Sequence, residues 1–407
     1  MGMFGFLDLL FAQMMINGLL ITMSAPTTPH TAYPQSDYVT GIDFHMDTVK
    51  HCAPGNDKCA YESDNWTITW SDDDHQYTSW GDGGGFGGDN RTGRASMGVA
   101  RIEGNKDNYS AHNLNGGVEP ESGKATWPDD GVNGGKCYGI ISIDLSEYGG
   151  QRGTLYLFRA GWKSGIDMFK QTELWKSTDH GLNWTYAGVR WVSDGSDGFF
   201  CPTFCQFGRD YDGGGEYVYI YAPEVTQSVS NDPWNVQKPG RISLIRCKKH
   251  ELEDIGKYQY FSGLDANGSP AWSDDISDRK PVFRDDQNGV MRTSVSYNKG
   301  LGRYFLITQQ VSRKHDKNGR IGIYETSKPW GQWKTLLFAN PWSIDLNQID
   351  GQKKTVYWNF SNKWLSLDGK QFVLVYTGPS SDQWGTVEGT FAIDHKGSPD
   401  RTLAPKP

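Results

Sequence analysis

The chain has 407 residues, of which 13% are aromatic and 50 are glycine, and its formal net charge is −8. This composition is typical of many short strands joined by tight turns, and it fits a helical protein poorly. No Lys- or Arg-rich run is present, which argues against a nucleic-acid partner. Abundant Trp and Tyr beside Asp and Asn favour sugar binding instead, because aromatic faces stack on sugar C–H groups.

The N-terminal segment is apolar over about the length of a secretory signal. It ends in a small residue, although it carries Asp8 and lacks a basic start. We interpret residues 1–25 as a signal peptide or membrane anchor and the Thr/Pro-rich residues 26–40 as a linker. The sequence therefore predicts a secreted or periplasmic protein, with no stable membrane association beyond that anchor.

The cysteine spacings do not match a zinc site or a C-x-x-C redox pair. Cys52 and Cys59 flank a Pro-Gly-Asn-Asp loop and could close a small disulfide. Cys201 and Cys205 would lie far apart along a strand, so we expect them to be buried free thiols.

After residue 40 the chain is a succession of strand-like segments such as TLYLFRAG, EYVYIYAP and RYFLITQQ. The segments repeat in order: CYGIISID, GTLYLFRAG and TELWKSTDHGLNW correspond to RTSVSYN, GRYFLITQQ and RIGIYETSKPWGQW. Five such units can be laid along the chain. The sequence therefore predicts an all-β, five-bladed β-propeller with four-stranded blades around a central funnel, over residues 41–395, followed by a tail over residues 396–407.

One turn carries a propeller motif. STDHGLNW, from Ser177 to Trp184, matches the S-x-D-x-G-x-x-W Asp-box of sialidase-type propellers. Its Ser and Asp tie a turn at the rim of a blade, and its Trp packs between sheets. We therefore interpret Asp179 as structural.

Polar residues on the first strand of a unit are expected to face the funnel. Tyr138, Trp358 and Asn359 are candidates for sugar contacts, with packing between blades as the alternative. Arg292 would bind a substrate carboxylate or hydroxyl, or form a buried ion pair between blades. Glu224, at the end of EYVYIYAPE, is a candidate third carboxylate in the funnel.

The order of ESDNW…SWGDGGGFGG, STDHGLNW, FFCPTFCQFGRDY, RTSVSYNKGLGRYFL and WLSLDGKQFVLVYTG resembles a family of exported bacterial propellers of largely unknown function. Some relatives of that family are glycoside hydrolases, including endo-D-arabinanases. The resemblance implies catalysis by two aspartates near the start of the propeller, one in a T-D turn and one in a following G-D turn. Asp64 in SDN and Asp82 in WGDG match these positions, although Ser replaces Thr in the first motif.

The chemistry of glycoside hydrolysis also favours Asp64 and Asp82 as the catalytic pair. Glycoside hydrolysis needs one carboxyl group as an acid and another as a nucleophile or base. A hairpin that starts at Asp64 and returns at Asp82 would bring both groups to one end. The aspartates at its opposite tip, within TWSDDDHQY, are interpreted as solvated turn residues: Asp72, Asp73 and Asp74.

The sequence thus predicts a glycoside hydrolase that cleaves a polysaccharide, such as an arabinan, as a monomer. No cofactor is expected, with a structural calcium ion left open. One alternative is a polysaccharide lyase, with Tyr138 or His45 as base and Arg292 neutralising a uronate. Another is a non-catalytic sugar-binding propeller, because one architecture hosts unrelated functions.

Overall fold

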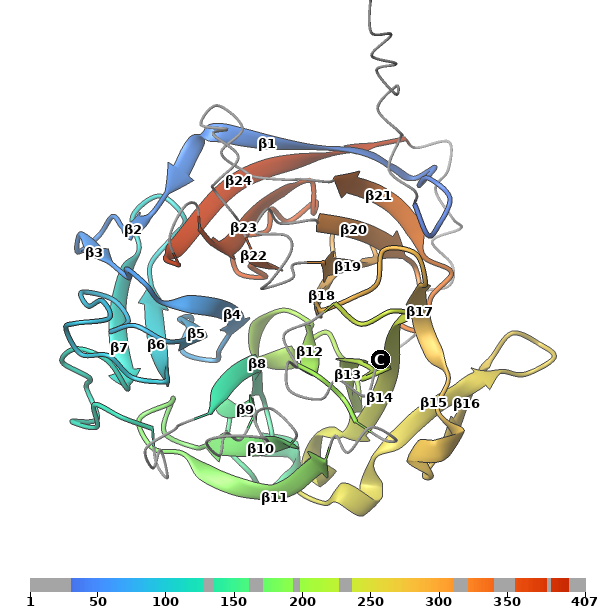
Figure 1. The fold of residues 1–407 in the computed structure, drawn as a ribbon, viewed down its shortest axis with the longest axis horizontal. Helices are drawn as coiled ribbons and strands as arrows, with labels where there is room; N and C mark the ends of the chain where they lie inside the picture. The colour runs from blue at the N-terminus through green and yellow to red at the C-terminus, as the bar shows by residue number, and fades with distance from the viewer. Residues whose placement is uncertain are drawn as a thin grey trace, which may run out of the picture. The chain divides into compact units, whose positions relative to one another are not determined.

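The computed structural model describes residues 31–127, 135–160, 171–192, 198–226, 236–310, 321–339, 356–378 and 382–394. These residues form β-strands and one-turn 3-10 helices, with no α-helix among them (Figure 1). None of these short helices has the length and apolar character needed to cross a membrane. The predicted signal peptide or anchor and the predicted tail lie outside the described residues.

Three sheets have four strands each. The first contains β4 (Asp64–Trp70), β5 (Gln76–Gly81), β6 (Met97–Glu103) and β7 (Ser110–Asn115). The second contains β8 (Lys136–Ile143), β9 (Thr154–Ala160), β10 (Gln171–Ser177) and β11 (Thr185–Val192). The third contains β22 (Val356–Phe360), β23 (Gln371–Thr377), β24 (Trp384–Ile393) and the N-terminal strand β1 (Val39–Lys50).

The remaining long strands form one continuous sheet. Its first half contains β12 (Thr203–Gln206), β13 (Tyr217–Pro223), β14 (Gly240–Lys248), β15 (Gln259–Leu264), β16 (Pro270–Ser273) and β17 (Pro281–Asp285). Its second half contains β18 (Arg292–Asn298), β19 (Arg303–Gln309), β20 (Ile321–Thr326) and β21 (Lys334–Ala339). A short parallel pairing of β12 with β18 joins the two halves, whereas the pairings within each half are antiparallel.

Short elements complete the chain. The 3-10 helices are η1 (Ser146–Tyr148), η2 (Arg209–Tyr211), η3 (Lys249–Glu251), η4 (Ile255–Lys257) and η5 (Ile276–Asp278). β2 (Cys52–Ala53) and β3 (Lys58–Cys59) form a hairpin closed by the predicted Cys52–Cys59 disulfide. Cys201 and Cys205 are buried free thiols, as the sequence predicted.

The first strand of each sheet or half-sheet lies innermost. β4 contacts β8 and β22, β12 contacts β8 and β18, and β18 contacts β22. Figure 1 shows these strands around the centre of the described chain. They are the strands that open the sequence repeats, so the polar residues on them share one central region. The predictions of an all-β chain and of four-stranded sheets are confirmed, while the continuous sheet of β12 to β21 was not predicted.

The N-terminal segment ties the two ends of the described chain together. β1 pairs with β24 as the outer strand of the C-terminal sheet. Just before it, Gln35 pairs with Thr335 on β21, and Ser36 donates a 2.6 Å hydrogen bond to Glu325 on β20. Gln35 and Ser36 fall within the predicted linker over residues 26–40, while β1 covers the edge of β24.

The Asp-box forms the turn that its motif predicts. Asp179 accepts hydrogen bonds from the Ser177 hydroxyl at 2.8 Å and from the Asn183 backbone N–H at 2.9 Å. The buried Trp184 donates to the Gly181 carbonyl and packs against Trp127, with ring centroids 5.3 Å apart. All polar contacts of Asp179 are therefore local, as expected for a structural residue.

Replacing Asp179 with alanine removes these hydrogen bonds from the turn. We expect D179A to lose about 1–2 kcal/mol of unfolding free energy, measured by denaturant titration, and to keep its activity. Asp107→Ala, on an exposed turn, serves as the control and should change stability little. Equal stabilities for D179A and the parent would contradict the assignment.

Candidate functional site

Asp64 is held in place by the pairing of β4 with β5. It is the first residue of β4, and it lies opposite Gly81, the last residue of β5. A Cβ atom on Gly81 would lie only 2.9 Å from Oδ1 of Asp64 and 3.2 Å from Nδ2 of Asn65. The Asp64 carboxyl group therefore packs directly over the glycine, and a larger residue at position 81 would displace it.

The environment of Asp64 favours the protonated form of its carboxyl group. Burial, followed by the negative charges of Asp382 and Asp82, raises its pKa to about 8, against the opposing effects of Lys136 and Arg292. Its buried Oδ1 makes no hydrogen bond within the described part of the chain. At neutral pH this group holds a proton that it could donate.

Asp82 directly follows β5, at the same end of the hairpin as Asp64. Its backbone has a φ of 55°, in the left-handed region that aspartate tolerates better than most residues. Its carboxylate forms ion pairs with Arg94, at 2.8 Å, and with Lys136. The side chain is 36% exposed, so this charged group is open to solvent.

Lys136 connects the two aspartates. It begins β8, and its side chain is only 5% exposed. The ammonium group pairs with Asp82, donates a 3.0 Å hydrogen bond to the Ser96 carbonyl, and lowers the pKa of Asp64. The buried ammonium group of Lys136 therefore interacts with both aspartates: it forms an ion pair with Asp82 and lowers the pKa of Asp64.

A third carboxylate, Asp382, was not predicted. It precedes β24. The negative charge of Asp382 raises the pKa of Asp64 more than the negative charge of Asp82 does. An aspartate before a strand, as in SSDQW, is a common turn residue, so no local pattern indicates that this one approaches the first sheet. Its approach depends on contacts of β22 and β23 with β4.

A cavity of about 330 Å³, including space open to solvent, lies beside Asp64. The residues that line it come from the inner strands β4, β8, β18 and β22 and from β19: Asn65, Thr67, Tyr138, Arg292, Thr293, Ser294, Ile307, Thr308, Gln309, Tyr357, Trp358 and Asn359. Four of the five predicted substrate-binding residues are among them: Arg292, Tyr138, Trp358 and Asn359.

Arg292 occupies this cavity between two aromatic rings. Its guanidinium carbon lies 4.7 Å from the ring centroid of Tyr138 and 4.0 Å from that of Tyr357. It also donates a hydrogen bond to Oδ1 of Asn65. Asn65 and Tyr357 have φ values of 70° and 60°, and a left-handed conformation is costly for a bulky tyrosine. Backbone strain of this kind often marks functional sites.

The other predicted sugar contacts are firmly packed. Trp358 is 2% exposed. Asn359 donates its amide to the carbonyls of Trp66, at 2.8 Å, and Tyr357, at 3.1 Å. Burial raises the pKa of Tyr138 well above its usual range.

Two predicted residues lie away from the cavity. Glu224 accepts a 2.6 Å hydrogen bond from Ser243 and lies 3.9 Å from Arg279. His45 is on the outer strand β1, with Nε2 at 3.4 Å from the hydroxyl of Thr390.

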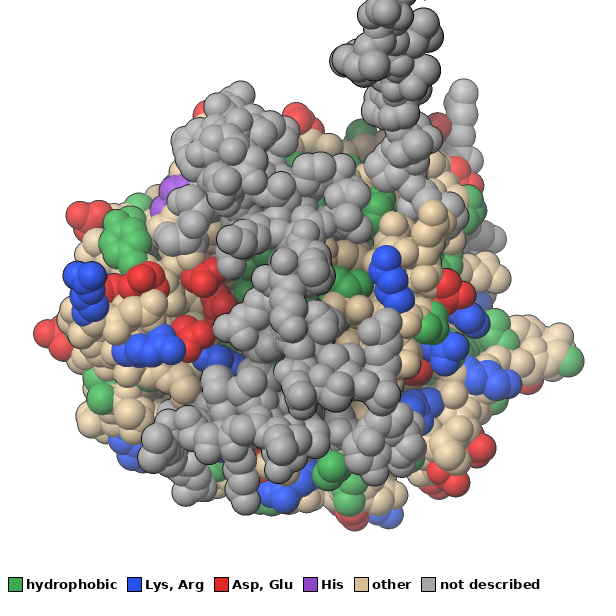
Figure 2. Space-filling view, in the orientation of Figure 1, with side chains coloured by type: hydrophobic (Ala, Val, Ile, Leu, Met, Phe, Trp, Pro, Cys, Tyr) green, Lys and Arg blue, Asp and Glu red, His purple; other side chains and the backbone are tan. Residues whose placement is uncertain are grey.

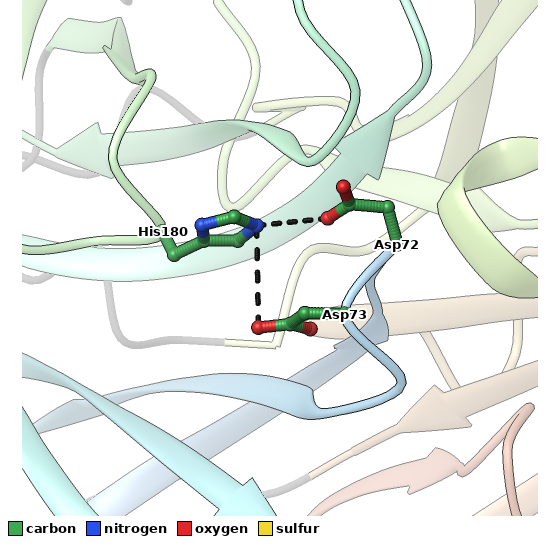
Figure 3. Close-up of side chains that lie close together, drawn as sticks. All are labelled: Asp72, Asp73 and His180. Carbon is green, nitrogen blue, oxygen red and sulfur yellow. Dashed lines mark hydrogen bonds and ion pairs between the residues drawn. The ribbon is translucent and has the colours of Figure 1, made fainter.

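Among the described residues, one group could hold a metal ion (Figure 3). At the tip of the β4–β5 hairpin, Asp72 and Asp73 face His180 of the Asp-box turn, with His180 Nε2 at 2.8 Å from Asp72 Oδ1. Asp73 also accepts a hydrogen bond from the Tyr77 hydroxyl at 2.5 Å. The donor atoms suit zinc better than calcium, but these hydrogen bonds satisfy the three groups without an ion.

The tip aspartates are turn residues, as predicted, but two of them also join sheets. Asp72 reaches the β8–β11 sheet through His180, and Asp74 forms an ion pair with Lys363. The space-filling view shows acidic and basic side chains next to one another over the β4–β7 sheet (Figure 2). The tip lies at the opposite end of the hairpin from Asp64 and Asp82.

The fold and this site define an all-β protein in which a buried aspartic acid with a raised pKa lies beside an ion-paired aspartate at the inner end of the first sheet. The chain belongs to the family of the domain of unknown function DUF4185, whose sequence profile matches residues 66–338. The predicted membership of a family of unknown function is thereby confirmed. A search of curated proteins finds no match.

Comparison with solved structures finds similar chains at low sequence identity. A Bacteroides ovatus protein named a "putative hydrolase" is 11% identical, with a TM-score of 0.50 over 90% of this chain and 97% of that one. An α-L-arabinofuranosidase from Podospora anserina is 10% identical, with a TM-score of 0.45 over 83% and 94%. The catalytic domain of a GH62 α-L-arabinofuranosidase from Coprinopsis cinerea is 9% identical, with a TM-score of 0.46 over 82% and 93%.

The raised pKa of Asp64 makes the stability of the protein depend on pH. The folded chain binds this proton more tightly than the unfolded chain, so the resulting stability is complete below pH ~4 and is lost as the pH rises toward about 8. Asp64→Asn cannot titrate. Relative to D64N, the parent should lose about 1 kcal/mol of unfolding free energy per pH unit between pH ~5 and ~8. Urea titrations across this range measure the effect, and parallel pH profiles would contradict it.

Proposed function

We propose that this protein is a glycoside hydrolase in which Asp64 and Asp82 carry out catalysis. The observation that carries the proposal is the unequal environment of the two groups. One end of a single hairpin holds a buried aspartic acid with a pKa of about 8 and an exposed carboxylate paired with two cations. A carboxyl group whose burial favours its protonated form would provide the acid, and an ion-paired carboxylate would provide the base or nucleophile of glycoside cleavage.

In the proposed reaction Asp64 donates its proton to the glycosidic oxygen as the bond to the anomeric carbon breaks. Asp82 either attacks the anomeric carbon directly or takes a proton from the attacking water. Once deprotonated, Asp64 is a buried anion near Lys136 and Arg292, whose positive charges stabilise it. No cofactor takes part in these steps.

We propose a polysaccharide as the substrate, and an arabinan is the first candidate because the sequence motifs resemble those of endo-D-arabinanases. We further propose that β4, β8, β12, β18 and β22 are the inner strands of five blades. The neighbour contacts among these strands support that count. Export of the protein as a monomer completes the proposal and rests on the apolar N-terminal sequence.

A polysaccharide lyase is the second candidate, supported by the contact between Tyr138 and Arg292. Two observations disfavour it. The Tyr138 pKa is raised well above its usual range, which makes the phenol a poor base, and His45 lies on an outer strand. A sugar-binding protein without catalysis would not need a buried acid with a raised pKa beside an ion-paired carboxylate.

Removing either carboxyl group tests the proposal. Asp82→Asn and Asp64→Asn should each lower the rate of arabinan cleavage by about 10²–10⁴-fold, because general acid–base catalysis contributes that much. The measurement is the release of reducing ends. Asp74→Asn, at the opposite tip of the same hairpin, is the matched control and should keep the parental rate.

Circular dichroism and thermal unfolding should show that both site variants keep the fold. Parental turnover in D82N or D64N would refute the assignment of catalytic roles. Products with the ultraviolet absorbance of an unsaturated uronate would establish the lyase instead.

A further inference from the structure

Arg292 is a buried cation without a carboxylate partner. Its residue exposure is 6%, and among the described residues its close contacts are the amide oxygen of Asn65, the faces of Tyr138 and Tyr357 and the thiol of Cys201. Other buried arginines in the chain have acidic partners. Arg303 lies 2.9 Å from Glu325, and Arg159 lies 3.8 Å from Glu173.

The carboxyl group of Asp64 does not compensate the positive charge of Arg292. Asp64 holds its proton at neutral pH, because its pKa is about 8. A buried charge that lacks an opposite charge is strongly destabilising, and buried ions are normally paired. Among the described residues, no carboxylate forms an ion pair with Arg292, although the charge of Asp382 acts on the neighbouring Tyr357.

A second donor in the cavity is also unsatisfied. Asn65 is fully buried and lines the cavity beside Arg292. Its Oδ1 accepts from Arg292, which fixes the orientation of the amide, and its Nδ2 has no hydrogen-bond partner. Unpaired buried donors are rare and call for a ligand or an ion.

Two of the hydroxyl groups around the cavity are already used. Ser294 donates to the Trp358 carbonyl at 2.6 Å, and Thr293 donates to the Ile307 carbonyl at 2.9 Å. The Arg292 guanidinium and the Asn65 amide are two buried donors that a ligand could engage. A cation does not fit this set, whereas an anion satisfies both the charge and the unpaired N–H group.

We propose that the cavity beside Asp64 binds a small monovalent anionic group through Arg292 and Asn65. The group is either a free inorganic anion such as a halide or the carboxylate of an acidic sugar. Both present a single compact negative charge to the same two donors. The inference is independent of the proposed hydrolase activity, since binding requires no turnover.

Thermal unfolding of the whole protein tests this site. The midpoint is measured in halide-free buffer while sodium bromide, sodium formate or sodium glucuronate is added at constant ionic strength. At about 100-fold excess over its dissociation constant, a bound anion should raise the midpoint by ~3 °C. Saturation with bromide and formate indicates a free-anion site, and a response to glucuronate at much lower concentration indicates a sugar carboxylate.

Two variants remove the site in different ways. Asn65→Asp tolerates the left-handed backbone and supplies the carboxylate that Arg292 lacks, so its midpoint should not respond to anions. Arg292→Gln removes the charge and should abolish the response too. Arg303→Gln, which removes a buried arginine that has a partner, should lower the midpoint but keep the response.

Bromide in crystals of the parent protein gives an answer that does not depend on the folding of any variant. An anomalous peak between the guanidinium of Arg292 and Nδ2 of Asn65 is expected. A cavity without such a peak, together with midpoints that respond to no anion, would overturn the proposal. A full anion response in N65D would overturn it as well.

Discussion

The pairing of Asp64 with Gly81 is the constraint on which the site depends. This pair follows a register shift between Asp64 and Thr67, places the Asp64 carboxyl group over a residue without a side chain, and brings Asp82 to the same end of the hairpin. A shift by one residue would turn Asp64 to the other face of the sheet. The buried Trp66 and Trp80, one on each strand, oppose such a shift, because both lie in the hydrophobic core beneath the hairpin. Packing of the first sheet thus sets the position of the proposed acid.

Charge in the site is distributed so that the two aspartates differ. Both lie near Lys136, but of the two only Asp82 forms ion pairs with described residues, while Asp64 is buried and faces the added repulsion of Asp382. Burial favours the neutral form of a carboxyl group, and a nearby cation favours the charged form. Burial and ion pairing therefore give the two carboxyl groups of one hairpin different environments. No unusual residue type is needed for this difference.

Local sequence was informative wherever function and fold depend on neighbours along the chain. The Asp-box, the disulfide of Cys52 with Cys59 and the return of the hairpin to Asp82 all involve short separations, and all could be read from spacing. Asp382 could not be found in this way, since its approach to Asp64 requires the C-terminal sheet to lie beside the first one. The parallel pairing of β12 with β18, which merges two sheets, is likewise a contact between segments that are distant in the sequence. Repeats predicted the number of strands in a sheet, but they carried no information about which sheets join.

The cavity and the proposed acid are linked through Arg292. This guanidinium group lines the cavity, and its charge is one of the two that lower the pKa of Asp64. An anion beside Arg292 would offset part of that positive charge and would therefore raise the pKa of Asp64 further. By the reciprocity of linked equilibria, a protonated Asp64 would in turn favour the anion, because a second negative charge is then absent. The unpaired arginine and the raised pKa of Asp64 are therefore two consequences of one arrangement, in which a buried positive charge lies next to a buried acid without forming an ion pair with it.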